Sequence, residues 1–164
     1  FLRCAAGLPQ RRGPSVIAVA LACGGLFLAS FLAATLLPAQ SELTLAALLM
    51  REAAPVWLLL AVATAGNTAG SSVNWLLGRS LARFQGRRWF PASAAALARA
   101  ERWYRRYGRW SLLLSWAPVV GDPLTLAAGV LREPFPSFVL MTLAAKLGRY
   151  LVVAAATLAW TGGP

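Results

Sequence analysis

Residues 43–52 read LTLAALLMRE, and residues 124–133 read LTLAAGVLRE. Seven of the ten positions are identical. Each copy follows a proline and an acidic residue, Pro38 with Glu42 and Pro118 with Asp122, and precedes another proline and a long apolar stretch. A unit made of a broken apolar segment and a long helix therefore occurs twice. Such duplication is typical of transporters that build a site at the bilayer midplane.

The apolar stretches around the two copies are long enough to cross a membrane. Hydrophobic residues make up 59% of the chain, charged residues make up 13%, and the mean hydropathy is +0.61. Residues 15–37, 56–77 and 135–160 are nearly free of charge, and a spanning helix needs about 20 apolar residues. Residues 15–37 are also too long for the apolar core of a signal peptide. We therefore predict an all-α, polytopic membrane protein with about three spanning helices.

The two segments between these spans are too short or too broken to cross. Residues 38–54 hold only a short apolar run after Glu42, and residues 110–133 are interrupted around an acid by Pro118, Gly121 and Pro123. Irregular backbone at membrane depth is tolerated where it is buried or lines a cavity. We predict two re-entrant elements in an inverted repeat, with breaks at Pro38 and at these three residues. The alternative for residues 38–54 is a short helix at the membrane surface.

We therefore expect one membrane domain, residues 15–160, which follows a basic tail, residues 1–14. Within it we expect spans at 15–37, 55–78 and 134–160, re-entrant elements at 38–54 and 110–133, and a basic loop at 79–109.

Basic residues gather in the loops. The net charge is +11, from sixteen basic and five acidic residues, and nine arginines fall within residues 79–109. The positive-inside rule places this loop and the N-terminus in the cytoplasm and the C-terminus outside. No nucleic-acid-binding module accompanies the charge.

The loop also contains the pattern of an amphipathic helix. Start signals at Pro91 and Ser93 and a stop at Gly108 bound it. One side carries Leu97, Ala100, Tyr104 and Tyr107, and the other carries Arg99, Arg102, Arg106 and Arg109. We expect this helix to lie on the anionic inner leaflet, the alternative being a solvated loop that only sets topology.

Two cysteines and no histidine limit the chemistry. A Cys/His metal site and a Ser-His-Asp arrangement cannot be built from them. We therefore expect no metal, no cofactor and no enzymatic activity.

The remaining candidates are polar residues inside apolar segments. Four carry charge and are candidates for transport or proton coupling: Glu42, Asp122, Lys146 and Arg149. Intramembrane charges persist when paired, so we expect an ion pair Glu42–Arg149 or Asp122–Lys146, and such a pair could also be purely structural. Four neutral residues are candidates for lining a polar path: Asn67, Asn74, Thr44 and Thr125. Gly66 and Gly70 share one helix face, where they permit close packing.

Several motifs together resemble the DedA family of bacterial inner-membrane proteins, also called VTT-domain or SNARE-associated-like proteins, and most closely its YqaA-like branch. The resemblance covers residues 28–158 and rests on GNTAG at 66–70, LLGR at 76–79, RYG at 106–108, SWAPVVGDPL at 115–124 and KLGRY at 146–150. It implies two re-entrant elements in an inverted repeat and a lipid flippase or scramblase, with undecaprenyl phosphate as a substrate of some members.

One departure bears on the substrate. Many members of the family carry two arginines around the second proline, and these positions fall at Ser115 and Gly121 here. A phosphate-binding role for those arginines does not transfer to this chain, although Lys146 and Arg149 could compensate.

Three functions follow as hypotheses. The first is a lipid or lipid-phosphate flippase, with membrane lipids and protons as partners and with envelope homeostasis as its role. The others are a proton-coupled transporter of a small solute and a non-transporting assembly factor, with self-association expected in either case. An unpaired, water-accessible Glu42 favours transport, and a dry, paired one favours a scaffold.

Overall fold

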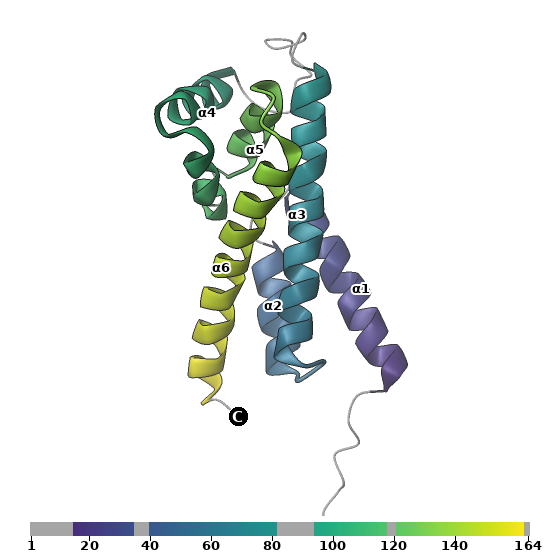
Figure 1. The fold of residues 1–164 in the computed structure, drawn as a ribbon. Helices are drawn as coiled ribbons and strands as arrows, with labels where there is room; N and C mark the ends of the chain where they lie inside the picture. The colour runs from purple at the N-terminus through teal and green to yellow at the C-terminus, as the bar shows by residue number, and fades with distance from the viewer. Residues whose placement is uncertain (1–14, 35–39, 82–93, 118–120, 163–164) are drawn as a thin grey trace, which may run out of the picture.

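The computed structural model describes residues 15–34, 40–81, 94–117 and 121–162, and every regular element in these ranges is helical. Figure 1 shows their arrangement. The elements, in chain order, are α1 (Val16–Ala33), α2 (Gln40–Met50), α3 (Val56–Leu81), α4 (Ala94–Tyr107), the 3-10 helix η2 (Gly108–Trp116), α5 (Gly121–Val130) and α6 (Phe135–Thr161).

The helix starts follow from capping residues in the sequence. The Ser15 hydroxyl accepts a hydrogen bond from the Ala18 amide at 3.2 Å and so caps α1. The carbonyl of Pro55 accepts from the Leu58 and Leu59 amides, and that of Pro134 accepts from the Phe138 amide. Proline suits these positions because it fixes the entry angle and has no amide hydrogen to leave unpaired.

The same turn closes both short helices. Glu52 and Arg132 have positive φ angles of 49° and 59°. The Ala53 amide donates to the Leu48 carbonyl across the first turn, and the Glu133 amide donates to the Ala128 carbonyl across the second. By these bonds Glu52 is structurally equivalent to Arg132, whereas in the sequence repeat Glu52 is aligned with Glu133. The duplicated sequence is therefore one residue out of register with the duplicated turn.

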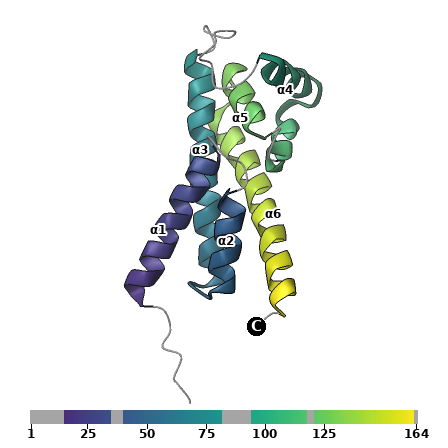
Figure 2. The same ribbon diagram turned by 180° about the vertical axis from the view of Figure 1, so that it is seen from behind.

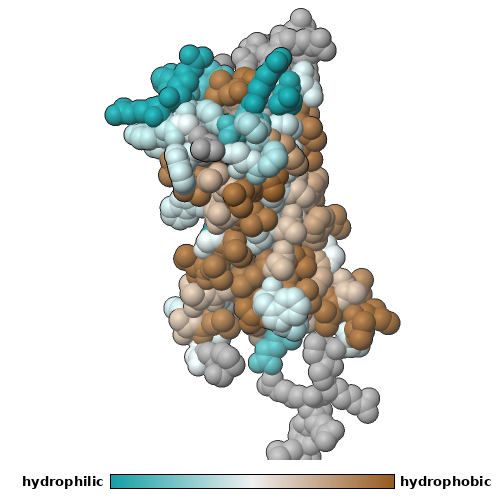
Figure 3. Space-filling model, viewed as in Figure 1, coloured by the Kyte–Doolittle hydropathy of each residue, from teal (hydrophilic) through white to brown (hydrophobic). Residues whose placement is uncertain are grey.

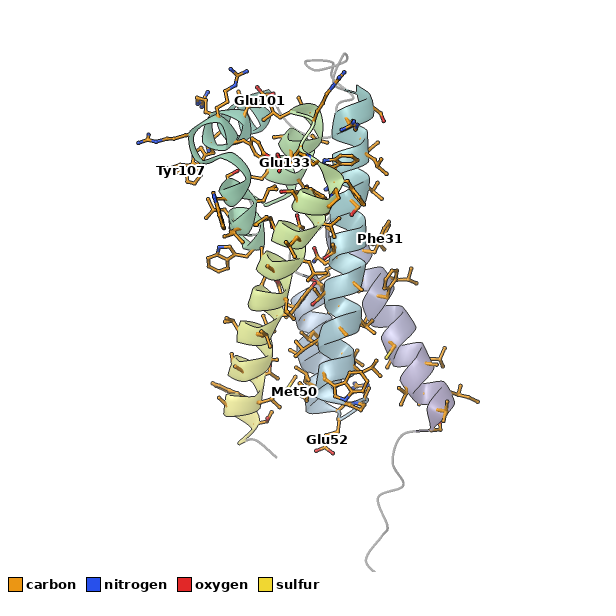
Figure 4. All side chains as sticks on the ribbon, viewed as in Figure 1. Phe31, Met50, Glu52, Glu101, Tyr107 and Glu133 are labelled. Atoms are coloured by element: carbon orange, nitrogen blue, oxygen red, sulfur yellow. The ribbon has the colours of Figure 1, made fainter. Side chains whose placement is uncertain are left out.

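Helices α3 and α6 run nearly the full height of the molecule, and the shorter elements divide between its two ends (Figures 1 and 2). Helices α1 and α2 occupy the lower half, and α4, η2 and α5 occupy the upper half. Figure 4 shows Phe31, near the end of α1, at mid-height, Glu52 at the lower end and Glu133 toward the upper end. The short helices α2 and α5 thus both start near the middle and run to opposite ends.

Within the described residues, three helices are long and apolar enough to cross a membrane, as predicted: Val16–Ala33, Val56–Ser80 and Phe135–Thr161. The arrangement nevertheless differs from the sequence expectation for α1. This helix rises only to mid-height, where α2 begins its return, so α1 and α2 together form a half-height hairpin (Figure 1). Hydropathy could not reveal this, because it measures the length of an apolar run and not where the run ends against its neighbours.

The hairpin formed by α1 and α2 also bears on which side of the membrane each part of the chain faces. Helix α1 begins at the end of the molecule opposite to α4 (Figure 1). The sequence expectation put the N-terminus and residues 79–109 on one side, which the described start of α1 does not favour. Which end faces the cytoplasm stays a prediction.

Close helix contacts at glycines hold both halves to α3. A Cβ atom at Gly66 would lie 2.6 Å from the Phe27 carbonyl oxygen of α1. On the upper half, a Cβ at Gly129 of α5 would lie 2.0 Å from the Trp75 carbonyl oxygen of α3, and one at Gly78 would lie 2.2 Å from that of Leu126. The predicted packing role of Gly66, and of Gly70 one turn later, is confirmed.

Among the described residues, each half of the molecule has an apolar core. The lower core joins α1, α2, α3 and α6 and contains Leu26, Leu45, Leu59 and Tyr150. The upper core joins α3, α4, η2, α5 and α6 and contains Trp75, Tyr104, Leu112, Ala128 and Phe138. The face shown in Figure 3 is apolar over much of its height, and its hydrophilic residues gather mainly at the upper end. Such a surface is typical of a protein surrounded by lipid.

Candidate functional site

Both duplicated acids lie in the first turn of a short helix. Glu42 is the third residue of α2, and Asp122 is the second residue of α5. A carboxylate at a helix N-terminus is stabilised by the unpaired amide groups and the helix dipole there. Helices α2 and α5 both start toward the middle of the molecule (Figure 1), and each acid lies in the first turn of its helix.

An ion pair joins one of these acids to α6. The Arg149 guanidinium contacts the Glu42 carboxylate, and their side chains are only 14% and 18% exposed. The pair was predicted from the scarcity of charge in these segments, and the structure confirms it. Taking two charges out of water is costly unless they remain together, so the pair holds α2 against α6.

Lys146 lies one turn before this pair on α6 and is 3% exposed. Its ammonium group interacts electrostatically with Asp122 first and, more weakly, with Glu42. Within the described residues it has no ion pair within 4 Å and no hydrogen bond, so the predicted Asp122–Lys146 ion pair is not formed. Lys146 instead lies in the field of both acids.

The four groups together make a balanced charged cluster. Two carboxylates, Glu42 and Asp122, face two cations, Lys146 and Arg149, so the formal charges sum to zero. The amino-terminal ends of two helices add partial positive charge on the same level. Such a cluster could accept an anion when one carboxylate releases its cation or takes up a proton.

The two predicted asparagines are both buried, and they have different partners. The Asn67 amide donates to the Tyr150 hydroxyl at 2.8 Å, next to Arg149 in the sequence. The Asn74 amide donates to the Ala34 carbonyl at 2.8 Å and so closes the end of α1. Asn67 therefore joins α3 to α6, whereas Asn74 joins α3 to the end of α1.

Sequence reasoning missed Tyr150 as the hydrogen-bond partner of Asn67. Its position, one turn after Lys146 on the same helix face, is the signal that could have identified it.

The two predicted threonines bond to their own helices. Thr44 donates to the Gln40 carbonyl and Thr125 to the Asp122 carbonyl, each at 2.8 Å. Other buried hydroxyls have no hydrogen-bond partner among the described residues, namely Ser30, Thr64, Thr68, Ser71, Ser115 and Thr142. Most of them lie on the buried face of α3 or on the parts of η2 and α6 that pack nearby. Buried polar groups call for partners, so this stripe is the better candidate for a polar lining.

Of the four residues predicted to interrupt the re-entrant elements, two lie outside the described residues and two lie inside them. Pro38 and Pro118 lie outside the described residues. Gly121 and Pro123 lie in the first turn of α5, where proline is tolerated, so they begin the helix after the break. Gly121 is required there because a Cβ atom would lie 2.5 Å from the Ser115 carbonyl oxygen of η2. No group of three metal-ligating side chains occurs within the described ranges.

Comparison with known proteins identifies a domain family and several proteins that the chain resembles. Residues 14–158 match the VTT domain. The chain is 42% identical over 138 residues to the inner membrane protein YqaA of Escherichia coli (strain K12), which covers 84% of this chain and 92% of that protein. The YqaA protein of Shigella flexneri matches to the same extent, again 42% over 138 residues.

A third relative is an uncharacterized protein of Haemophilus influenzae, 35% identical over 135 residues that cover 78% of this chain and 82% of that protein. No solved structure matches the chain. The names of these relatives state no catalytic activity.

Proposed function

Because this chain belongs to the VTT-domain, or DedA, family, we propose that it is a transporter of the bacterial inner membrane that moves a lipid or lipid phosphate between leaflets. The membrane assignment is supported by three apolar helices of spanning length and by the name of the relatives. The substrate class is supported by the charged cluster at the meeting of the two halves.

The observation that carries this proposal is the charged cluster of two carboxylates and two cations, in which Arg149 is paired with Glu42. Arg149 is the cation that an anionic phosphate would bind, and Glu42 is the group that holds this cation in the absence of substrate. Protonation of Glu42 would weaken its attraction for Arg149, which would then be available to the anion. A proton taken up from one side could in this way be coupled to movement of the lipid headgroup.

The half-height hairpins support access from both sides. Helices α1 and α2 extend from the centre to one end, and η2 and α5 extend from the centre to the other (Figures 1 and 2). We propose that they are two re-entrant hairpins related as an inverted repeat. Their acids, Glu42 and Asp122, would then lie at equivalent depths, each near the inner tip of one hairpin.

The test is transport by the purified protein in liposomes. A labelled lipid phosphate is placed in one leaflet, a pH gradient is applied, and the fraction reaching the other leaflet is followed with time. Transport above that of protein-free liposomes, competed by unlabelled lipid phosphate and not by free phosphate, is the expected result. Competition by free phosphate alone would point instead to a small-solute transporter, and no transport of either would contradict the proposal.

A non-transporting scaffold is the second candidate, and one observation favours it. Glu42 is paired with Arg149, as a structural tie between helices would require. Replacing the pair by Leu at Glu42 and Met at Arg149 separates the two functions. A scaffold would keep its assembly state with this apolar pair, whereas a transporter would lose movement of lipid while remaining folded.

A further inference from the structure

The outer face of α4 carries a basic stripe beside an aromatic pair. Arg99, Arg102 and Arg106 recur at helical spacing and are all exposed. Trp103 and Tyr107 lie next to them on the helix, are 42% and 51% exposed, and have ring centroids 6.0 Å apart. These two rings and the three arginines form what we call the α4 face.

The charges on this face are not neutralised by neighbouring acids. The one acidic residue of α4, Glu101, is half-buried and lies on the far side of the helix from Arg99 and Arg106. The Arg106 guanidinium lies over the Tyr107 ring, 5.6 Å from its centroid. Figure 3 shows hydrophilic residues over α4 at the upper end of the molecule. Arginine beside exposed tryptophan and tyrosine matches the boundary between lipid headgroups and acyl chains.

The opposite side of α4 packs against the rest of the protein, and Tyr104 makes a polar contact there. Tyr104 is 9% exposed, and its hydroxyl donates to the Glu133 carboxylate in the α5–α6 turn. The Glu133 carbonyl accepts from the Trp75 indole of α3 at 3.2 Å. Glu133 thus connects α4 to the turn that ends α5, the helix whose first turn carries Asp122.

We propose that the α4 face binds anionic phospholipid headgroups of the adjacent leaflet and that the Tyr104–Glu133 contact transmits this binding to the α5–α6 turn. Charge complementarity selects the partner, because a bilayer surface containing phosphatidylglycerol is anionic, flat and bounded by an apolar layer that accepts the two rings. This surface is distinct from the central ion pair, and its role does not depend on which molecule is transported.

The binding is tested in the full-length chain in lipid nanodiscs, with Cys4 and Cys23 replaced by Ser and an environment-sensitive dye on Ala98→Cys. Ala98 is exposed on α4 beside the basic stripe. Adding phosphatidylglycerol to zwitterionic discs should move the dye into a less polar environment. Replacing Arg99, Arg102 and Arg106 together by Gln should shift this equilibrium on the order of 100-fold toward the unbound state, at about five-fold for each arginine.

The matched control replaces the same three arginines by Lys, which keeps the charge and should keep most of the response. High salt should weaken the wild-type response, because screening acts on exposed charges. A dye that ignores phosphatidylglycerol would overturn the proposal. So would a dye that responds to an added oligonucleotide and not to the lipid, since the face would then recognise another polyanion.

The coupling is tested with a second label. A dye on Arg132→Cys, in the α5–α6 turn, should respond to phosphatidylglycerol in the otherwise wild-type protein. Tyr104→Phe removes only the hydroxyl, so it should abolish the response at position 132 and leave that at position 98. An unchanged response at both positions in Tyr104→Phe would refute transmission through this contact.

Discussion

Lys146 is the residue for which burial and charge conflict most. It is 3% exposed, and the nearest opposing charge on α5 is Asp122, which interacts with it electrostatically without an ion pair. Such a cation tolerates its site only while a carboxylate offsets it. The stability of the buried Lys146 ammonium group therefore depends on Asp122, which belongs to another helix.

This dependence predicts a coupled effect of two substitutions. Asp122→Asn should lower the free energy of unfolding by about 3 kcal/mol, because it leaves Lys146 without its main counter-charge. Adding Lys146→Met should restore part of that loss. Thermal unfolding in detergent of the single and double variants measures the coupling, with exposed Arg51→Gln as control. Losses that simply add would mean that the two residues do not interact.

At the scale of helices, glycines decide how closely α5 approaches α3. A Cβ atom at Gly129 would lie 2.0 Å from a backbone oxygen that cannot move aside, whereas one at Gly24 of α1 would meet nothing within 4 Å. Gly129→Ala should therefore destabilise the protein by about 2 kcal/mol or more through overpacking. Gly24→Ala should be neutral or stabilising by up to about 1 kcal/mol. Equal melting temperatures for the two variants would contradict this packing.

The turns after α2 and α5 hold residues whose backbone suits glycine better. Arg132 has a φ of 59° and an exposed side chain. Because the left-handed conformation costs a non-glycine residue roughly 1 kcal/mol, Arg132→Gly should raise the free energy of unfolding by about that amount. Arg132→Ala keeps the Cβ atom and serves as the control. A gain in Arg132→Ala as large as in Arg132→Gly would show that loss of the charge, and not the backbone, is responsible.

The helices and turns also show how much of the fold could be predicted from the sequence. The starts of α3 and α6 and the stop of α4 at Gly108, with its φ of 58°, follow from prolines, apolar length and a glycine. The half-height course of α1 does not, because an 18-residue apolar helix is long enough to cross and only its contact with Gly66 and Gly70 places it. The one-residue shift between the sequence repeat and the repeated turn could not be predicted either. Identical residues in two segments do not determine which backbone groups form hydrogen bonds.

The site was predictable to a similar degree. Glu42 and Asp122 stand out as duplicated acids, and Arg149 stands out as a charge inside an apolar helix. Thr142 carries no such signal, because uncharged polar residues are common in membrane helices, and Tyr150 is marked only by its position one turn after Lys146. Only the packing of α6 against α3 brings Tyr150 to Asn67.

For the whole molecule, the proposed inverted repeat predicts that the two turns lie on opposite sides of the membrane. Cysteines at Arg51 and Arg132, both exposed, should react with a membrane-impermeant reagent from opposite faces of sealed vesicles. Cys4 and Cys23 are replaced beforehand, and permeabilised vesicles serve as the control for reactivity. Labelling of both positions from a single face would exclude the inverted arrangement.

We propose that Glu42 controls transport by holding and releasing Arg149. The most direct measurement is lipid-phosphate movement in liposomes at a series of external pH values, with wild-type protein and Glu42→Gln. The Gln amide oxygen can still accept a hydrogen bond from Arg149, so the variant should fold and insert. We predict that wild-type transport rises as pH falls and that Glu42→Gln loses this dependence on pH. A Glu42→Gln protein with the wild-type pH profile would contradict the account.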